Sequence, residues 1–488
     1  MMLWTIVLLP LLLGVIALFL KKKGVVLNLL ILGSVVYFLH VLMFWLFPPP
    51  GNTLVFLDFA GIFLLTLTGF LFLVVSFYTR GYLACEPVTA DRDKEEGFLF
   101  RNEPVSLFVG CLFFFLAAMT LVCVSADMGL LWVGVEGTTL ASAPMIFYHR
   151  HHRSLEATWK YLLICSVGIA LALMGNIFLS YSGSTNIESL YIPLLGEKAV
   201  FLDPRWLKVA FILLVVGYGT KMGIAPLHSW LPDAHSEAPS MVSALLSGAL
   251  LNCAFLGIFR SQGIMIQAGL GDWSGRILQL FGIVSLLTAA LFMIRQVDFK
   301  RMLAYSSVEH MGVLSLGIGI GGIAGTGAML HLVNHSLTKG LLFLTAGNIL
   351  SIYQSKKINE VKGIAQRAPK TGLLWVLGFF AVSGSPPFGM FFSEWIVLKG
   401  VLDVKSWEIA VLYLLSLGII FISMARYMIP MVWGENASIR AGENPVKEPA
   451  WMWVPPLVLC GGVLLLGLYI PSSLGEFLVL TFSGWGGF

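Results

Sequence analysis

Four ionisable residues lie inside long apolar stretches of the sequence. They are Glu136 in MGLLWVGVEGTTLASAPMIF, Lys221 in FILLVVGYGTK, Lys339 in HLVNHSLTKGLLFLTAGNIL and Glu394 in PPFGMFFSEWIVLKG. A charge in the middle of a bilayer costs several kcal/mol, so such residues usually face a protein interior and serve ion or proton transfer. A structural ion pair, or a lysine that reaches the interface, is the alternative for any one of them. Four such residues of both signs favour a proton path.

Histidines accompany these charges. His331, His335 and Lys339 are spaced i, i+4 and i+8, so they form one stripe on a helix. Histidine titrates near neutral pH and suits a proton relay. The HxxxH spacing could also hold zinc or copper, but no third ligand lies nearby in the sequence. A buried, hydrogen-bonded histidine is the remaining alternative, and we predict no metal site.

The elements that position these residues are predicted to be membrane-spanning helices. Apolar residues make up 58% of the chain and charged residues 11%, whereas soluble proteins carry about 25% charged residues. The apolar runs approach the roughly 20 residues that cross a bilayer as a helix, and they lack the alternation of barrel strands. We predict an all-α polytopic membrane protein with about fourteen spans. The expected spans are 3–20, 25–47, 54–78, 104–123, 125–148, 157–181, 207–224, 240–262, 276–296, 303–321, 323–352, 373–400, 407–433 and 451–470.

Two of these spans contain helix breakers, at KMGIAP and at SGSPPFG. Interrupted spans are tolerated where a polar cavity satisfies the freed backbone groups. Breaks in corresponding positions of two halves are typical of transporters with inverted repeats. We therefore predict broken helices 7 and 12 in two inverted five-helix repeats, 104–262 and 263–433. A three-helix segment, 1–103, precedes them and a C-terminal helix lies within 434–488.

Loop charge predicts the orientation. Lys and Arg gather in loops such as HRHHRSLE, which are therefore predicted to lie inside, with both termini outside. The six cysteines form no CxxC pair, so we expect no iron–sulfur, zinc or disulfide framework. His228 and His235, in HSWLPDAHSE after the first break, could form an inside proton entrance or belong to a hydrated turn. Glu309 and His310 begin the span 303–321 with the same ambiguity.

The segment KMGIAPLHSWLPDAHSEAPS resembles the signature of the antiporter-like subunits of respiratory complex I, cation/proton antiporter complexes and group 4 membrane-bound hydrogenases. The resemblance covers nearly the whole chain and continues through DMGLLWVGVEGTTLAS, DFKRMLAYSSVEHMG, HLVNHSLTKGLLFL and PPFGMFFSEW. The segments SLEATWKYLLICSVGIALALMG and YSSVEHMG are most similar to the hydrogenase-4 component F type of formate hydrogenlyase.

This resemblance implies roles for the buried residues along a central polar axis. Glu136 and Lys221 would be the coupled pair of the first half, Lys339 with His331 and His335 the central relay, and Glu394 the terminal group. The possible entrance or relay residues are His228, His235, Ser243, Asn252 and His310. The sequence departs from many relatives at SALLSGALLNCAFLG, which offers Ser247 and Asn252 where a lysine or histidine is common. The relay would then need water, oriented by Asn252 or Ser243.

The resemblance also implies a function. We expect a proton-translocating subunit of a redox-driven respiratory complex of the group 4 [NiFe] hydrogenase or formate hydrogenlyase type, without catalytic activity or cofactor of its own. Its expected partners are antiporter-like neighbours and peripheral hydrogenase-like or quinone-reductase-like subunits with iron–sulfur clusters, in a prokaryotic cell membrane and without nucleic acid. The alternative is a subunit of a sodium/proton antiporter complex or of NADH:quinone oxidoreductase. Sodium favours clustered oxygen ligands, and the carboxylates here are isolated in sequence.

Overall fold

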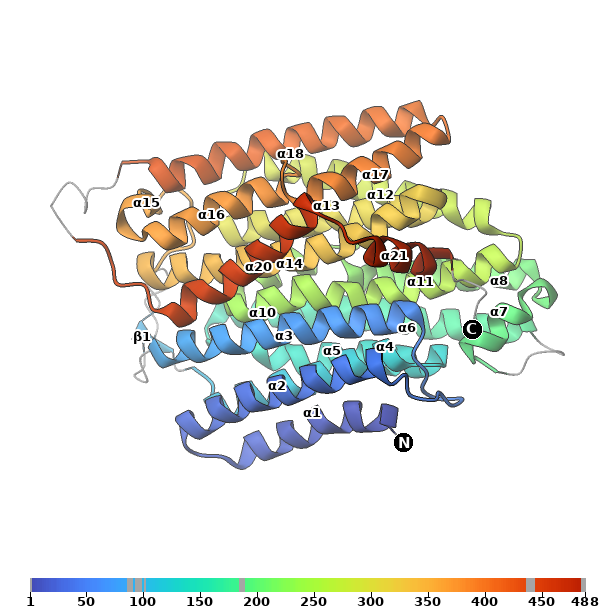
Figure 1. Ribbon diagram of the computed structural model, residues 1–488, viewed down its shortest axis with the longest axis horizontal. Helices are drawn as coiled ribbons and strands as arrows, with labels where there is room; N and C mark the ends of the chain where they lie inside the picture. The colour runs from blue at the N-terminus through green and yellow to red at the C-terminus, as the bar shows by residue number, and fades with distance from the viewer. Residues whose placement is uncertain are drawn as a thin grey trace.

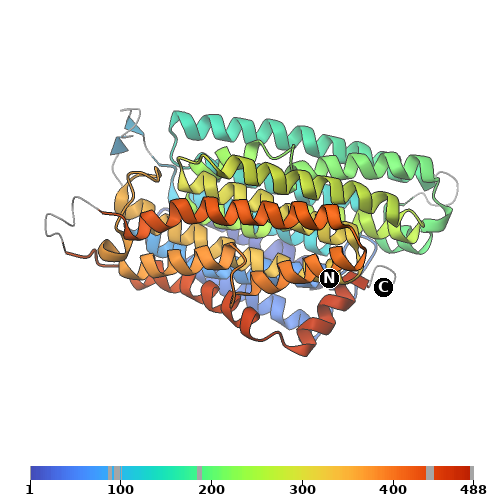
Figure 2. The ribbon, with the colours of Figure 1, turned by 90° about the horizontal axis from the view of Figure 1, so that it is seen from above.

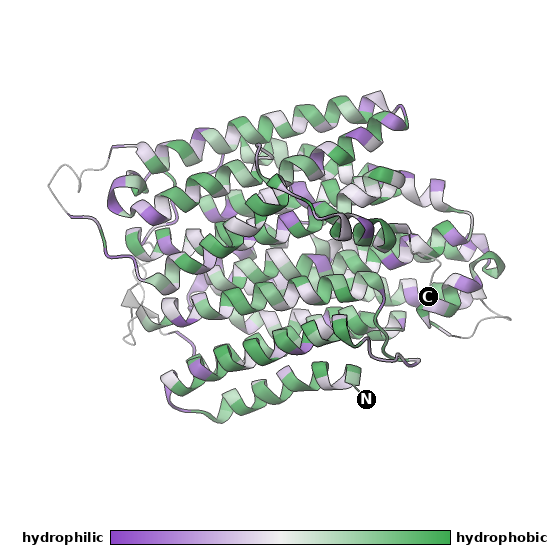
Figure 3. Ribbon diagram, in the orientation of Figure 1, coloured by the Kyte–Doolittle hydropathy of each residue, from purple (hydrophilic) through white to green (hydrophobic). Residues whose placement is uncertain are grey.

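The chain folds into a bundle of long helices that run side by side (Figure 1). The computed structural model describes residues 2–85, 91–92, 99–100, 102–183, 189–435 and 444–483. Three basic residues that enter the predicted orientation, Lys94, Arg101 and Arg440, lie outside the described residues. Figure 3 shows hydrophobic residues along most of the helices and more hydrophilic ones toward the two ends of the bundle.

The helices follow one another with short connections. The first part of the chain forms α1 (Met2–Phe19), α2 (Lys23–Leu46), α3 (Phe59–Cys85), α4 (Val105–Val124), α5 (Met128–Ile146), α6 (His152–Gly183), α7 (Ile192–Glu197), α8 (Pro204–Met222), α9 (Trp230–Glu237), α10 (Ser240–Leu245), a π-helical turn (Leu246–Leu250) and α11 (Leu251–Gln267). The second part forms α12 (Gly271–Met293), α13 (Phe299–Ile320), α14 (Gly322–Tyr353), α15 (Ile364–Arg367), α16 (Pro369–Val382), α17 (Gly389–Asp403), α18 (Trp407–Trp433), α20 (Ala450–Leu468) and α21 (Ser472–Ser483). The short strands β1 (Asp91–Arg92) and β2 (Leu99–Phe100) pair antiparallel.

The predicted class, an all-α polytopic membrane protein, is confirmed. Within the described residues, nine helical stretches are long and apolar enough to cross a membrane. They are α1, α2, α3, α4, α6, the continuous stretch from α10 to α11, α12, α18 and α20. The other expected spans correspond to α5, α8, α13, α14 and the pair α16–α17, and these five carry the ionisable residues singled out in the sequence.

Both predicted breaks are present, and glycine makes each of them possible. Helix α8 ends at Met222, where Gly223 takes a φ of 79° as its C-cap, and α9 starts at Trp230. Helix α16 ends at Val382, Gly384 follows with a φ of 60°, and α17 starts at Gly389. Side chains with a Cβ rarely adopt these backbone angles, so glycine is the residue that can end the helix this way. The breaks stop the helices at the level where Lys221 and Glu394 lie.

The second helix of each predicted repeat begins in the same way. Asp127 caps α5 by accepting hydrogen bonds from the amides of the first turn, and Asp298 does the same for α13. Asp127 pairs with Tyr191 beside α7, whereas Asp298 pairs with Lys357 near α15. Figures 1 and 2 place these surroundings at opposite ends of the bundle, with both termini toward the α7 end. The inverted relation between the halves stays a prediction.

Three features differ from the sequence expectation. Helix α13 begins at Phe299, earlier than the expected span 303–321, so Glu309 and His310 lie about halfway along it. The glycine-rich junction before α14 is a true helix boundary, with Gly321 at a φ of 78°. The short helix α21 was not expected, because its 12 residues are too few to span a membrane. It packs against α14 and α3.

Close backbone approach holds α6 against α8. A Cβ added at Gly217 of α8 would lie 2.5 Å from the Ala172 amide nitrogen and 2.7 Å from the Gly168 carbonyl oxygen. Small residues at such positions let membrane helices pack tightly. This packing fixes Lys221, one turn further along α8, against α6.

We expect Gly217→Ala to destabilise the protein by about 1–3 kcal/mol, because backbone atoms cannot move aside for the added methyl group. Gly418→Ala is the matched control, since Gly418 is an exposed glycine inside α18 with nothing within 4 Å of an added Cβ. Thermal unfolding in detergent measures both. A Gly217→Ala protein as stable as Gly418→Ala would contradict the close packing of α6 on α8.

Candidate functional site

A row of buried polar side chains crosses the bundle from α5 to α17. Its members are at most 7% exposed: Thr139, Tyr161, Lys221, His235, Ser247, Asn252, Ser307, Glu309, His310, His331, Asn334, His335, Lys339, Ser393 and Glu394. They come from eight helical segments, so only the folded bundle assembles them. Polar groups in such an environment need partners, because an unpaired one costs several kcal/mol.

Lys221 and Glu136 meet through a hydroxyl group. The Lys221 ammonium donates to Thr139 Oγ1 at 2.8 Å and to the Tyr161 hydroxyl at 2.5 Å. Thr139 in turn donates to Glu136 Oε2 at 3.2 Å, and Ser166 donates to Glu136 Oε1 at 3.3 Å. The predicted pair is therefore brought together with Thr139 between the two charges. Thr139 and Tyr161 were not singled out from the sequence.

The segment after the first break turns inward. His235 on α9 is fully buried and stacks on Phe343 of α14, with ring centroids 4.9 Å apart. Ser243 donates to the His235 carbonyl at 3.1 Å. The hydrated turn considered for His235 is thus wrong. His228 lies nearer the edge, 9% exposed, with its ring against Tyr305.

Short polar side chains connect the middle of the row. The Ser247 and Ser307 hydroxyls are 2.8 Å apart, joining the π-helical turn to α13. The Asn252 amide donates to Ser336 of α14 at 2.7 Å, and its Oδ1 has no hydrogen-bond partner. Asn252 and Ser247 therefore occupy the space between the first and second halves, where the sequence offers no lysine.

Lys339 is held by α13. Its ammonium donates to the Leu303 carbonyl at 3.0 Å and to the Ser306 hydroxyl. Glu309, also on α13, is 1% exposed and lies within Coulombic range of both Lys339 and Glu394. The inner-edge position considered for Glu309 and His310 is therefore wrong, because α13 starts earlier than expected and carries them into the interior.

The histidine stripe faces a third histidine. The His310 ring lies 5.2 Å from each of the His331 and His335 rings. His331 Nδ1 is 3.0 Å from Ser393 Oγ, and His335 Nε2 is 3.2 Å from the Ser247 carbonyl oxygen. Ligand atoms of His310, His331 and Glu394 lie within 4.8 Å of one another. This donor set could bind a metal ion as well as relay protons.

Ion pairs close the bundle at the end opposite α7. Glu237 binds Lys356 at 2.5 Å and His151 at 3.6 Å, and Asp233 binds Lys160 at 3.0 Å and Arg301 at 3.2 Å. In the loop before α6, burial lowers the pKa of His149 to about 3, and nearby positive charges including His151 act in the same direction. The His149 imidazole therefore stays neutral at physiological pH.

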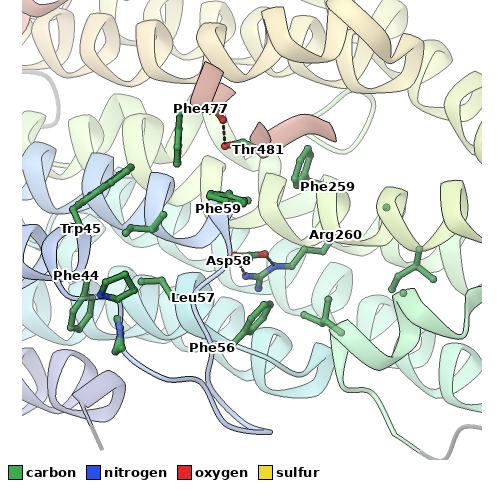
Figure 4. Close-up of a pocket in the computed structure, with 18 of the residues that line it drawn as sticks. Phe44, Trp45, Phe56, Leu57, Asp58, Phe59, Phe259, Arg260, Phe477 and Thr481 are labelled. Atoms are coloured by element: carbon green, nitrogen blue, oxygen red, sulfur yellow. Dashed lines mark hydrogen bonds and ion pairs between the residues drawn. The ribbon is translucent and has the colours of Figure 1, made fainter. Parts of the chain in front are cut away.

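A cavity of about 430 Å³ lies toward the opposite end, between the start of α3, α11 and α21 (Figure 4). Aromatic rings such as Phe59, Phe259 and Phe477 form its walls. Arg260, which the sequence placed in an outside loop flank, is only 4% exposed and binds Asp58 at 2.9 Å. It also donates to the Ser125 carbonyl at 3.0 Å. The loop placement of Arg260 is therefore wrong.

Comparison with known proteins follows the same residues. A family model described as "NADH:quinone oxidoreductase/Mrp antiporter, TM" matches residues 125–420. The chain is 34% identical to a "Hydrogenase-4 component F homolog" of Methylacidiphilum infernorum, over 84% of this chain and 87% of that protein. It is 32% identical to "NADH-quinone oxidoreductase subunit N" of Desulforudis audaxviator, over 71% of each.

The fold matches a solved structure as well. A chain of the membrane-bound sulfane sulfur reductase, an archaeal respiratory membrane complex, superposes with a TM-score of 0.87 over 99% of this chain and 97% of that chain. The sequence identity is 19%, so this likeness concerns the fold alone.

We expect Arg260→Gln to destabilise the protein by about 3–5 kcal/mol, because it leaves the largely buried Asp58 carboxylate without its charged partner. Arg205→Gln is the matched control, since the Arg205 side chain is 88% exposed and binds Asp203 at 3.2 Å at the surface. Thermal unfolding in detergent compares the two variants. Equal midpoints would show that the Asp58–Arg260 pair contributes no more than a surface pair.

Proposed function

The chain belongs to the NADH:quinone oxidoreductase/Mrp antiporter transmembrane family, and on this premise we propose that it translocates protons as an antiporter-like subunit of a redox-driven membrane complex. The complex proposed is of the group 4 [NiFe] hydrogenase or formate hydrogenlyase type. One observation carries the proposal: ionisable residues from both halves line up inside the bundle, joined by hydroxyl and imidazole groups.

The first half works as a charge-controlled proton donor. Glu136 stabilises the Lys221 ammonium across Thr139, and attraction across such a short separation is strong where water is scarce. Neutralising or moving the Glu136 charge weakens that attraction. Lys221 then releases its proton toward the interior, and return of the negative charge favours reprotonation.

The second half receives the proton. The hydroxyls of Ser247 and Ser307 and the imidazole of His335 lie between the halves and can donate and accept. Lys339 takes up the proton under the influence of Glu309, which stands to Lys339 as Glu136 stands to Lys221. His331 and Ser393 then connect it to Glu394, the terminal group.

The proposed orientation places the α15 end of the bundle inside a prokaryotic cell membrane and both termini outside. The connections at that end carry Lys and Arg in clusters such as HRHHR before α6 and SKK after α14. Cytoplasmic loops of membrane proteins carry this excess. His228, Asp233 and Glu237 would then lie on the side from which protons enter.

Partners supply the electron transfer. We propose antiporter-like membrane neighbours and peripheral subunits with iron–sulfur clusters, and no cofactor in this chain. The relative named as a hydrogenase-4 component F homolog supports the hydrogenase type. The relative named as a subunit of NADH-quinone oxidoreductase supports the alternative, a subunit of that enzyme.

A sodium/proton antiporter complex is the second alternative. The structure supplies one observation in its favour, because Glu309 and Glu394, isolated in sequence, come within Coulombic range of each other. Clustered oxygen ligands of this kind are what a hard cation needs.

We expect mass spectrometry of the complex, purified in mild detergent, to find a nickel–iron hydrogenase large subunit and ferredoxin-like subunits with this chain. Antiporter-like neighbours should be present in either case. Recovery of small membrane subunits alone would contradict the redox-driven complex and favour ion exchange.

We expect Lys221→Ala to abolish coupled proton translocation in membrane vesicles while the complex stays assembled, because the proton donor of the first half is lost. Lys198→Ala, which removes an exposed lysine after α7, should translocate at the normal rate. Translocation by Lys221→Ala at the wild-type rate would exclude the role given to Lys221.

The Thr139 bridge supplies a graded version of the same test. Thr139→Val removes a hydrogen bond to a charged group, worth about 1.5–3 kcal/mol, so coupling should fall roughly tenfold or more. Thr139→Ser keeps the hydroxyl and should retain most of the rate. Equal rates for the valine and serine variants would show that Thr139 does not couple the two charges.

A further inference from the structure

The fold completes a set of metal-ligand donors that the sequence leaves incomplete. His331 lies on α14, His310 on α13 and Glu394 on α17, and their ligand atoms lie within 4.8 Å of one another. The HxxxH pair alone lacks a nearby third ligand in the sequence. Packing of α14 against both α13 and α17 supplies that ligand from a helix more than 50 residues away.

Hydrogen bonding leaves a lone pair free on His331. The Ser393 hydroxyl donates to the Met390 carbonyl at 2.8 Å, so its oxygen accepts the proton of His331 Nδ1 at 3.0 Å. Nε2 of His331 is then the unprotonated nitrogen, and it is buried without a hydrogen-bond partner. An imidazole oriented through one nitrogen with a lone pair on the other is how histidine binds metals.

The other two ligands are equally unsatisfied. Neither nitrogen of His310 has a hydrogen-bond partner, and Oε1 of Glu394 has none. A Cβ at Gly384 would collide with Glu394 Oε2, so the second helix break leaves the space in which this carboxylate sits. Buried donors of this number and kind indicate a ligand, because unpaired polar atoms in a membrane interior are costly.

The charges that face the cluster allow a cation. Glu309 and Glu394 bring two carboxylates, and Lys339, which opposes a cation, is directed away to Ser306 and the Leu303 carbonyl. His335 adds a neutral or protonated imidazole beside His310. The Tyr413 hydroxyl donates to the Glu394 backbone carbonyl at 3.4 Å.

We propose that His310, His331 and Glu394 form a binding site for a divalent transition-metal ion of the zinc class. Two imidazoles and one carboxylate are donors that zinc prefers, with the fourth position left to water. Zinc–nitrogen bonds of about 2.0–2.1 Å bring tetrahedral ligands to roughly 3.3 Å from one another. Side-chain movements of about 1 Å suffice to close the site.

The bound ion would occupy the lone pairs that His331 and Glu394 use for protons. Binding would therefore inhibit translocation through the second half. The inhibition rests on the proposed function, whereas the binding itself does not.

The test uses the purified complex in detergent, dialysed against Zn²⁺ and then assayed for bound zinc, with Co²⁺ as a spectroscopic probe. We expect one ion that His310→Gln, His331→Gln or Glu394→Gln each removes, together with the visible absorption of tetrahedral Co²⁺. His228→Gln is the matched control and should keep the ion, because His228 lies outside the cluster. Ser393→Ala should weaken zinc binding about 10–100-fold through loss of the orienting hydrogen bond.

Each outcome decides between binding and function. Zinc binding that is absent from the wild-type complex, or lost equally in His228→Gln and His331→Gln, overturns the metal site. Binding that depends on the three ligands but leaves translocation unchanged supports the site and contradicts the proton route through His331 and Glu394. Because wild-type protein and Ser393→Ala carry the spectroscopic test, a ligand variant that fails to fold does not decide it.

Discussion

The cost of an ammonium group inside a membrane protein is the constraint on which this structure depends. Lys221 and Lys339 are both fully buried, and neither pairs directly with a carboxylate among the described residues. Each is instead held by neutral oxygen atoms, from Thr139 and Tyr161 in one case and from Ser306 and the Leu303 carbonyl in the other. The carboxylates stay one step away. A direct buried ion pair would fix both charges, whereas a hydroxyl between them keeps the attraction and permits proton exchange.

The helix breaks follow from the same constraint. An intact helix satisfies its own carbonyls and amides, and therefore offers no backbone groups or space to a buried charge. Ending α8 at Gly223 places Lys221 in the last turn, where the negative end of the helix dipole favours an ammonium. Beginning α17 after Gly384 leaves the space against which Glu394 rests. Irregular backbone thus occurs where the chain holds charge, in both halves of the molecule.

The sequence predicts a good part of this arrangement, because membrane helices are specified locally. Apolar run length, helix breakers and charges within spans are all readable along the chain, so the spans, both interruptions and the buried character of Lys221 and Lys339 could be anticipated. Contacts between helices are not readable in this way. Thr139 looks like one more small residue of α5 until α8 packs beside it. Glu309 looked peripheral because a shift of a few residues in the start of α13 moves it from the rim to the interior. Arg260 looked like a loop charge because its partner, Asp58, is about 200 residues away.

The unsatisfied atoms of the row mark where the protein exchanges partners. Where a side chain has one fixed role, as Arg260 does, its donors are engaged by carbonyls and a carboxylate. Around His310 the opposite holds, and several nitrogen and oxygen atoms face one another without a hydrogen bond among the described residues. A group that passes a proton needs a free lone pair for part of its cycle, so incomplete hydrogen bonding is a requirement of the task. The same free lone pairs are what a metal ion binds. Susceptibility to a zinc-like ion would therefore arise from the chemistry of proton transfer itself, at the one place where two imidazoles and a carboxylate converge.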